Sequence, residues 1–436
     1  MPFSHDSPVK QRAVIVGGVR TPFLRAFGAF TVMDSIALSV AAVRALLAKT
    51  GDIRNDIDGV LWGGAILPSA APNVGREMVL DLGLPPTIKA TTLTRACTSG
   101  LMAISEAAAT IERGEADVMI AGGSDSTSNA EVTMPPSLVH KAAPVVLSAK
   151  SGVRDYFRLL AKISIRRDLL PRRPSVRERT TGELMGEAAE RMTRHWGIAR
   201  EDQDAFALQS HQRAAAAIAS GRFADEIITV QTPEGVSVTA DDIVRGDTSI
   251  EKLAKLRPAF AKNGTLTAGN SSALTDGAAA VLVMAEEKAR ALGFEPLAAF
   301  RSWSYDAVDP ADQLLIGPAI SIPIALDRAG MTLGDVDIVD IHEAFAAQVL
   351  CVLRALASDA FAQKRLGRDK ATGELAPDAI NIHGGSVALG HPFGATGARM
   401  IITMANELKR SGKETALLGI CAAGAQSAGV ILEAVP

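Results

Sequence analysis

The first third of the chain alternates short apolar runs with apolar residues at helical spacing. The runs lie at residues 13–16, 60–64 and 117–123, and each is followed by or ends in glycine, which predicts buried strands that lead into turns. Small and apolar side chains recur at helical spacing over residues 35–49, and apolar residues step by three and four from Leu101 to Ile111. Alternating strands and helices favour a mostly parallel sheet covered by helices.

The last third of the chain repeats this pattern. Residues 336–341 and 415–420 predict two further strands, and Phe345 begins a helix whose apolar face runs to Leu356. The second strand ends in a small-residue turn at residues 421–424, much as the strand near residue 120 ends in glycines. The repetition indicates a duplicated α/β unit.

Composition places the chain among ordinary globular proteins. Its 436 residues suggest two or three domains, with 47% apolar and 21% charged residues. A net charge of −3 argues against nucleic acid as a partner. Residues 1–10 lack the apolar core of a secretory signal, and the run at 278–285 is far shorter than the ~20 residues of a membrane helix. The 3 cysteines suit a reducing compartment, so we expect a cytoplasmic protein.

Residues 141–179 differ from the rest of the chain. They contain eleven Lys or Arg against three Asp or Glu, interleaved with apolar residues such as Tyr156, Phe157 and Leu160. One interpretation is a solvated basic helix in an insertion. The other is a surface for a protein partner, an acidic ligand or a membrane.

Cys97 is the first candidate for chemistry. It immediately precedes the helix that begins near Leu101, and the positive end of a helix dipole lowers a thiol pKa and favours the thiolate. Free backbone N–H groups at the same place can stabilise an oxyanion. A lone cysteine before a helix is more often a buried small residue, so catalysis also requires a base.

His391 supplies a candidate base. It lies in residues 384–397, where five of the fourteen residues are glycine and Pro392 fixes the backbone after the histidine. Glycines allow a ligand to approach the backbone closely, and a histidine on such a loop can activate a thiol. The alternative is a tight structural turn with an incidental histidine.

The other two cysteines have different contexts. Cys421 follows the last predicted strand, whereas Cys351 lies within the helix that begins at Phe345 and is interpreted as core packing. No pair of cysteines or histidines has the spacing of a zinc site, and His342-Glu343 lacks the second histidine of a zincin motif. We therefore predict no metal.

Taken together, these segments resemble the thiolase family nearly from end to end. The resemblance rests on the opening Val14 to Phe23, the nucleophile segment Cys97-Thr98-Ser99-Gly100, the coenzyme A loop Thr267 to Ser272 with Asp276-Gly277-Ala278, His342-Glu343-Ala344-Phe345-Ala346, Gly390-His391-Pro392 and Cys421. Histidine at 342 and the basic insertion resemble the thiolase (β) subunit of fatty-acid-oxidation trifunctional complexes.

The resemblance implies a fold and a domain order. It implies an α/β protein with duplicated βαβαβαββ halves that form a layered α-β-α-β-α core, plus an inserted loop domain. We assign residues 8–125 to the N-terminal half, completed by about 259–290, residues 126–258 to the loop domain and 291–436 to the C-terminal half. It also implies a homodimer or a dimer of dimers.

The resemblance further implies 3-ketoacyl-CoA thiolase activity, an acetyl-CoA C-acyltransferase reaction of fatty-acid β-oxidation with no bound cofactor and coenzyme A as co-substrate. Cys97 would be the nucleophile, His391 its base and Cys421 the second acid/base. His391 with a water held by His342 would form one oxyanion hole, and the backbone N–H groups of Cys97 and Ala423 the other.

Six residues would contact coenzyme A by the same resemblance. These are Met185, Arg245, Ala268, Ser272, Ala344 and Phe345, of which Arg245 would lie near the nucleotide and Ser272 near the pantetheine. An alternative for Arg245 is a solvated surface arginine. In the complex that the chain resembles, the loop corresponding to 141–179 contacts a hydratase–dehydrogenase α-subunit or an anionic membrane.

One departure and two alternatives accompany the resemblance. The family usually has more glycine after the second cysteine than Ala425 and Ser427 allow, and a residue with φ > 0 there would cost on the order of 1 kcal/mol. The enzyme could instead run in the biosynthetic direction as an acetoacetyl-CoA thiolase. It could also be a thiolase-like protein that binds acyl-CoA without turnover. A ketosynthase would carry histidine at the position of Cys421.

Overall fold

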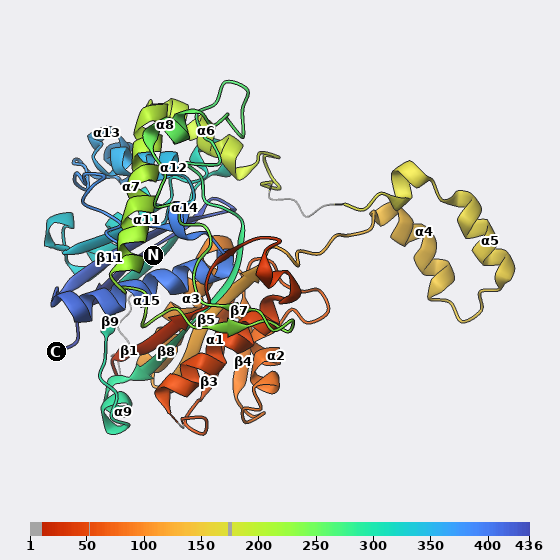
Figure 1. The fold of residues 1–436 in the computed structure, drawn as a ribbon, viewed down its shortest axis with the longest axis horizontal. Helices are drawn as coiled ribbons and strands as arrows, with labels where there is room; N and C mark the ends of the chain where they lie inside the picture. Colours follow the sequence, from red (N-terminus) through yellow and green to blue (C-terminus); the bar gives the residue numbers. More distant parts are fainter. Residues whose placement is uncertain (1–10, 52, 173–176) are drawn as a thin grey trace. The chain divides into compact units, whose positions relative to one another are not determined.

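The computed structural model describes residues 11–51, 53–172 and 177–436 (Figure 1). The chain divides into two compact units. The larger unit consists of the described parts of Met1–Asn129 and Arg177–Pro436, and the smaller one of the described part of Ala130–Val176.

A ten-stranded sheet runs through the larger unit in the order β10-β11-β12-β9-β1-β8-β5-β3-β4, with the short β2 (Leu24–Arg25) beside β8. The N-terminal half contributes β1 (Ala13–Arg20), β3 (Gly59–Gly63), β4 (Lys89–Leu93), β5 (Val118–Ser126) and β8 (Thr275–Ala285). The C-terminal half contributes β9 (Ala298–Ala307), β10 (Ile338–Ile341), β11 (Thr415–Ala422) and β12 (Gln426–Glu433). The two halves meet where Val14 and Ile15 of β1 pair with Ala299 and Ala298 of β9.

The sheet is mixed, so the expectation of a mostly parallel sheet is wrong. β3 pairs in parallel with β4 and β5, and β10 with β11, but β8 is antiparallel to both β1 and β5, and β12 is antiparallel to both β9 and β11. β8 returns to the sheet after the inserted region, and β12 returns directly from β11 through a tight turn. Each half therefore contains antiparallel strands that helix-based crossovers alone would not produce.

Three apolar clusters separate the layers of the larger unit. The outer helices α1 (Ser35–Thr50) and α2 (Val74–Asp81) share one cluster with the N-terminal strands. The helices α3 (Ser99–Glu112) and α15 (Phe393–Ser411) share a second cluster with strands of both halves. The helices α11 (Pro318–Ala329) and α12 (Ala346–Leu356) share the third with the C-terminal strands. The N-terminal strands and the C-terminal strands of the sheet are thus two β layers with α3 and α15 between them, which is the predicted α-β-α-β-α layering.

The central helices α3 and α15 approach unusually closely at their N-terminal ends. A methyl group added at Gly100 would lie 2.1 Å from the Gly394 carbonyl oxygen, and one at Gly123 would lie 2.2 Å from the same atom. Glycine at these positions is therefore required by contact and not by backbone conformation. Because Cys97 precedes α3 and His391 precedes α15, this contact brings the two sequence motifs into one region.

Part of the predicted loop domain also belongs to the larger unit. It includes α6 (Met185–Trp196), α7 (Arg200–Ala219), the strands β6 (Val230–Gln231) and β7 (Ser237–Val238), and α8 (Ile250–Ala254). The helix α7 contacts α12 and α14 (Ser386–Leu389). The remaining short helices are α9 (Glu286–Ala291), α10 (Pro310–Gln313) and α13 (Asp359–Phe361). The domain boundaries given above stay a prediction at the level of single residues.

The smaller unit is a helical hairpin. It consists of α4 (Pro136–Val146), α5 (Val153–Lys162) and a turn at Ile165–Leu169, closed by backbone hydrogen bonds between Thr133 and Arg172. The buried Asp168 carboxylate accepts hydrogen bonds from Lys141 Nζ at 2.7 Å and from the Ser164 N–H at 2.7 Å. No helix in the described part of the chain is both long and apolar enough to cross a membrane.

Candidate active site

Cys97 lies in a single tight turn between β4 and α3. The residue before it, Ala96, has a left-handed backbone with φ of +48°. The Ser99 hydroxyl fixes this turn, because it accepts a hydrogen bond from the Arg95 N–H at 2.7 Å and donates one to the Ala96 carbonyl at 2.7 Å. Strained backbone of this kind persists where the surroundings over-determine it and is common at functional sites. The turn presents a half-buried Cys97 side chain at the N-terminal end of α3.

The Cys97 thiol is not a thiolate at rest, and the expectation of a lowered pKa is wrong. Burial raises the pKa of Cys97 to about 12; a hydrogen bond from the Ala423 N–H offsets part of this shift, and the charge of Asp125 adds to it. Loss of hydration outweighs the helix end because the free thiolate would lose water on most sides. The site therefore needs a base that removes the proton during the reaction.

His391 has the hydrogen bonding of such a base. Its Nδ1 lies 2.6 Å from the Thr396 hydroxyl, and that hydroxyl donates its single proton to the Pro392 carbonyl at 2.9 Å. Thr396 must therefore accept from Nδ1–H, which leaves an unprotonated Nε2. This Nε2 is buried and has no hydrogen-bond partner among the described residues. Burial and the charge of Arg399 lower the pKa of His391 to about 3, so the ring is neutral and can accept a proton.

His342 lies beside His391. The ring centroids are 4.2 Å apart, and the His342 Nδ1 is 3.1 Å from the Ser386 hydroxyl. Burial, His391 and Arg399 together hold the pKa of His342 well below its ordinary value. Its Nε2 is also buried, again without a partner in the described part of the chain. Two neutral imidazoles thus present unused ring nitrogens in one small region.

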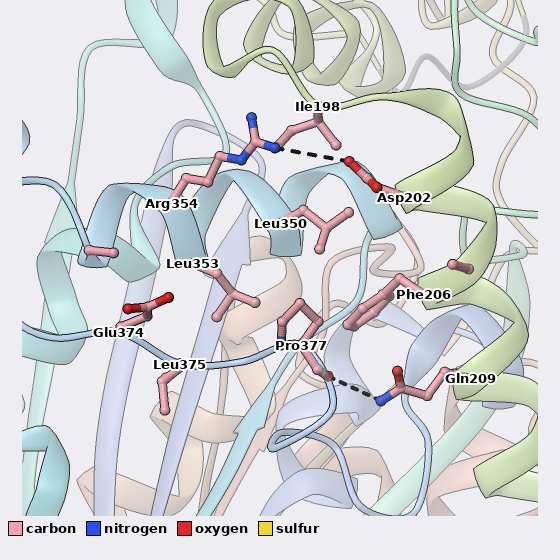
Figure 2. Close-up of a pocket in the computed structure, with 12 residues that line it drawn as sticks. Ile198, Asp202, Phe206, Gln209, Leu350, Leu353, Arg354, Glu374, Leu375 and Pro377 are labelled. Carbon is pink, nitrogen blue, oxygen red and sulfur yellow. Dashed lines mark hydrogen bonds and ion pairs between the residues drawn. The ribbon is translucent and has the colours of Figure 1, made fainter.

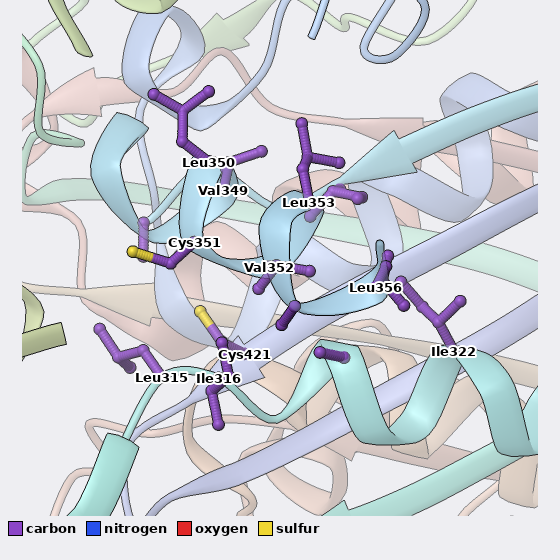
Figure 3. Close-up of a cluster of buried hydrophobic side chains, with 14 of the residues drawn as sticks. Leu315, Ile316, Ile322, Val349, Leu350, Cys351, Val352, Leu353, Leu356 and Cys421 are labelled. Atoms are coloured by element: carbon purple, nitrogen blue, oxygen red, sulfur yellow. The ribbon is translucent and has the colours of Figure 1, made fainter. Parts of the chain in front are cut away.

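Cys421 is the second-last residue of β11 and is buried (Figure 3). Burial and the proximity of Cys97 raise its pKa well above the ordinary value, so it is a protonated thiol. Cys351, in α12, is packed in the same apolar cluster, which confirms its interpretation as a core residue. The three cysteines are all free thiols.

The turn after Cys421 has the strain that its composition suggested. Ala425 is left-handed with φ of +56° and fully buried, whereas Ser427 lies in the extended strand β12. The left-handed position is thus Ala425 and not Ser427. Ala423, which lies between Cys421 and Ala425, directs its N–H at the Cys97 sulfur.

The predicted coenzyme A loop packs on the segment that follows His342. Both the N–H and the hydroxyl of Ser272 donate to the Ala344 carbonyl, at 3.1 Å and 2.9 Å, and the Phe345 ring meets Phe260 edge-on with centroids 5.7 Å apart. Met185, at the start of α6, packs against the same apolar cluster. Ser272, Ala344 and Phe345 are therefore brought together, and Met185 packs on the apolar cluster that contains Ala344 and Phe345.

Two of the predicted contacts lie on exposed positions. Ala268 is an exposed residue of the loop, and Arg245 is exposed, with its backbone N–H donating to His211 Nδ1 at 3.2 Å. An exposed arginine suits either a nucleotide phosphate or solvent. The assignment of Arg245 stays a prediction.

Four polar residues that shape the site were not found by sequence reasoning. Asp125, two residues after the second glycine of β5, accepts hydrogen bonds from the N–H groups of Ala65, Ile66 and Gly394, and burial raises its pKa to about 6. Thr396, Ser386 and Arg399 act through the two histidines. Asp125 could have been noticed as a charged residue at the end of a buried strand. The other three contacts depend on how the chain folds.

A cavity in the described residues lies away from these side chains. It has a volume of about 380 Å³ between α7 and α12, with apolar walls from Phe206, Leu350 and Leu353 and an ion pair of Arg354 with Asp202 at its rim (Figure 2). None of the predicted site residues lines it. The described residues also include no group of three His, Cys, Asp or Glu that could hold a metal ion.

A protonated cysteine facing an N–H donor, a neutral histidine with a free acceptor nitrogen and a second buried thiol define a cysteine-based acyl-transfer site. Comparison with known proteins agrees with this class. The family profile "Thiolase, N-terminal domain" matches residues 13–287, and "Thiolase, C-terminal domain" matches residues 294–434. The chain belongs to the thiolase family.

Individual relatives match over almost the whole chain. The chain is 43% identical over 424 residues to the 3-ketoacyl-CoA thiolase of Yersinia enterocolitica, covering 97% of each protein. The crystal structure of the Bacillus anthracis acetyl-CoA acetyltransferase matches with a TM-score of 0.82 and 32% identity, covering 98% of this chain and 100% of that one. Human mitochondrial 3-ketoacyl-CoA thiolase in complex with CoA matches with a TM-score of 0.82 and 30% identity, covering 98% and 99%.

Proposed function

We propose that this protein is a 3-ketoacyl-CoA thiolase, an acetyl-CoA C-acyltransferase that uses coenzyme A to cleave 3-ketoacyl-CoA into acetyl-CoA and a shortened acyl-CoA. The observation that carries the proposal is the pairing of the Cys97 thiol with the Ala423 N–H, together with a His391 whose Nε2 is buried and has no partner among the described residues. Family membership and the names of the relatives support it. The reaction belongs to fatty-acid β-oxidation.

The first half of the reaction acylates Cys97. His391 Nε2 takes the thiol proton as the sulfur attacks the 3-keto carbon, and the N–H groups of Cys97 and Ala423 donate to the oxyanion that forms. The bond between C2 and C3 then breaks, and its electron pair passes into the enolate of acetyl-CoA. His391, now carrying a proton on Nε2, donates a hydrogen bond to the enolate oxygen, and a water held by His342 donates a second one. Cys421 delivers its proton to C2.

The second half releases the shortened product. The thiol of coenzyme A gives its proton to the Cys421 thiolate and attacks the acyl group on Cys97, and the Cys97 sulfur leaves and takes back the proton held by His391. Splitting one carbon–carbon cleavage into two acyl transfers through a thioester lowers each barrier. Coenzyme A is thus a co-substrate, and the chemistry requires no further cofactor.

We further propose that coenzyme A lies along the surface formed by Ser272, Ala344 and Phe345, with Met185 and Ala268 beside it and Arg245 near the nucleotide. The hydrogen bonds from Ser272 to Ala344 tie the loop to the segment that carries His342. The structure of the human relative is of a complex with CoA. An Arg245→Ala variant should raise KM for CoA and leave kcat nearly unchanged; an unchanged KM would remove Arg245 from the site.

The functional form is proposed to be a homodimer or a dimer of dimers. β4 is the end strand of the sheet in the described residues, and its residues are half-buried or exposed. Exposed edge strands favour pairing with a further strand. Because β4 leads directly into Cys97, pairing of β4 with a strand of a second copy would also help to fix the position of the nucleophile. Mass measurement in solution tests this proposal, and a monomer at micromolar concentration would contradict it.

For the helical hairpin of residues 130–172 we propose weak association with an anionic membrane surface. Val153, Phe157 and Leu160 of α5 are 73%, 69% and 64% exposed on one helix face. The segment 141–179, which includes α5, contains eleven Lys or Arg against three Asp or Glu. Each Lys or Arg close to an anionic bilayer contributes roughly 1 kcal/mol, and the effect fades beyond a Debye length of about 8 Å.

The membrane proposal is tested with vesicles that contain phosphatidylserine. A triple variant with Arg154, Arg158 and Arg166 changed to Glu should lose salt-sensitive binding and keep thiolysis of a short substrate. The matched control is a triple variant with Arg44, Arg54 and Arg222 changed to Glu, which are exposed positions of the larger unit. No binding by the unchanged protein would refute the proposal, and binding to a hydratase–dehydrogenase α-type subunit instead would identify the surface as a protein interface.

The activity itself is tested by separating the two half-reactions. Cys97→Ser should abolish both acyl exchange and thiolysis, whereas Cys421→Ala should still form an acyl-enzyme with acetyl-CoA, found by mass spectrometry on Cys97, and fail in cleavage. Equal loss in the two variants would show that the roles are wrong. Thiolysis of 3-ketoacyl-CoAs of graded length distinguishes a β-oxidation enzyme from an acetoacetyl-CoA thiolase, and an absence of turnover with all of them would leave an acyl-CoA-binding protein.

A further inference from the structure

We infer that Ser386 and Arg399 are positioning residues that hold His342 with its proton on Nε2, so that this nitrogen donates a hydrogen bond toward the enolate oxygen. The inference rests on the proposed function. It assigns a role to two side chains that contact neither substrate nor the reacting sulfur, and it makes the two neighbouring histidines opposite tautomers.

Counting protons at the Ser386 hydroxyl gives the tautomer. Arg399 Nη2 donates to the Ser386 oxygen at 3.3 Å, and His342 Nδ1 lies 3.1 Å from the same oxygen. These are the two polar partners of that hydroxyl among the described residues, and Ser386 is fully buried. If Nδ1 carried the proton, the hydroxyl would accept twice and its own proton would lack an acceptor. If Ser386 donates to Nδ1, each group has a partner, and the imidazole proton is on Nε2.

Arg399 is held so that it can act only as a donor at this point. Its side chain is 1% exposed and pairs with Asp340, with 3.5 Å between Nη1 and Oδ2. A guanidinium has no acceptor and does not lose its proton in proteins. The Ser386 oxygen therefore always receives a hydrogen bond from this side, which directs its own proton toward His342.

The backbone around Ser386 is fixed as well. The buried Glu343 carboxylate accepts from the Val387 N–H at 3.1 Å and from Asn381 Nδ2 at 2.7 Å. A methyl group at Gly385 would lie 2.4 Å from the Glu343 carboxyl carbon, so the start of α14 is packed directly against this carboxylate. Ser386 cannot move away from His342 without breaking these contacts.

The neighbouring ring, that of His391, is held in the opposite tautomer, and α15, the helix that carries Arg399, is responsible. Thr396 of α15 accepts from Nδ1–H of His391 because its own proton goes to the Pro392 carbonyl, and this leaves His391 Nε2 bare. Arg399 lies three residues further along α15. One helix thus prepares an acceptor nitrogen to take the thiol proton and, through Ser386, a donor nitrogen for the enolate oxygen. Both nitrogens are buried and lack partners among the described residues.

Two measurements test the inference in the full-length protein. The first is the nitrogen NMR spectrum of ¹⁵N-histidine-labelled enzyme, in which the protonated nitrogen of each neutral ring is identified by its shift. We expect His342 to carry its proton on Nε2 and His391 on Nδ1, with the preference at His342 weakened in Ser386→Ala. A proton on Nδ1 of His342 in the unchanged protein would overturn the inference, whatever its activity.

The second measurement is a double-mutant cycle of Ser386→Ala and His342→Ala. Losing one oxyanion donor costs ~10²–10³ in rate, so Ser386→Ala should slow carbon–carbon cleavage by up to about 10²-fold and leave acyl exchange within about threefold. The double variant should be no slower than His342→Ala. Ser302→Ala, which removes a buried hydroxyl bonded to Ala325 O at 2.7 Å, is the matched control and should retain both rates.

The outcomes of the cycle are distinct. If the rate losses of the two single variants multiply in the double variant, Ser386 has a general structural role and the inference is refuted. Equal loss of acyl exchange and of cleavage in Ser386→Ala would refute it in the same way. Failure of the unchanged protein to cleave any 3-ketoacyl-CoA would refute the proposed function instead, and the NMR result would still decide the tautomer.

Discussion

Replacing Ala425 with glycine tests whether the turn after Cys421 stores strain. Ala425 has φ of +56° and no exposed surface. A left-handed backbone costs an L-residue roughly 1–2 kcal/mol, which glycine would recover. Against this, the variant loses a buried methyl group worth ~0.8 kcal/mol and gains ~0.4–1 kcal/mol of freedom in the unfolded chain. The two effects nearly cancel, so the free energy of unfolding should change by less than about 1 kcal/mol.

The comparison variant is Ala416→Gly in β11. Ala416 is equally buried but has an extended backbone. Glycine there loses the buried methyl group and adds freedom to the unfolded chain, and it relieves no backbone strain, so we expect roughly 1–2 kcal/mol of destabilisation. Urea unfolding of both variants at one protein concentration measures the difference, since association would otherwise shift the midpoint. A loss at Ala425 as large as that at Ala416 would show that the turn is unstrained. Thiolysis measured alongside reports whether the Ala423 N–H keeps its position.

Three further predictions follow from the geometry. The rate at which iodoacetamide alkylates Cys97, measured by mass spectrometry, should rise about tenfold per pH unit from about pH 7 to 10, because thiolate forms only as the pH approaches the pKa of about 12. A rate that stops rising near pH 8 would mean that Cys97 is a thiolate at rest. Thr396→Val, which leaves His391 Nδ1–H buried without a partner at a cost of ~1–3 kcal/mol, should slow both half-reactions at least fivefold, and Thr396→Ser should restore them. Gly100→Ala, whose methyl would lie 2.1 Å from an α15 carbonyl oxygen, should lower the unfolding midpoint strongly, whereas Gly17→Ala, with nothing within 4 Å, should not.

Local patterns predicted the elements that carry local signals. The strands β1, β3, β5, β10 and β11 and the helices α1, α3 and α12 lie where apolar runs and helical spacing indicate. β8 is different: its run Thr275–Ala285 is apolar and fully buried, but nothing local reveals that it separates β1 from β5 and opposes both. Strand order and direction depend on pairing across long sequence separations, which is why the mixed sheet was missed.

The site shows the same division. The resemblance of the ordered motifs to the thiolase family made Cys97, His391 and Cys421 the catalytic candidates, and these roles stay a prediction. The charge state of Cys97 could not be read in this way, because the helix end is a local feature and the loss of hydration is a property of the packed protein. Ser386 and Thr396 could not be assigned either, since each gains its role from one hydrogen bond that only the fold creates.

The charge states of the two active-site cysteines order the proposed reaction. A charge on Cys97 disfavours a charge on Cys421, and this coupling adds to the burial that keeps Cys421 protonated. At rest both are neutral thiols, so the second acid is ready before substrate arrives. This coupling would act only if both sulfurs were ionised, and in the proposed reaction they never are, because Cys97 passes from a neutral thiol to a thioester, with its proton on His391, before Cys421 gives up its own proton. Cys421 can therefore deliver its proton to C2 without meeting a charge on Cys97.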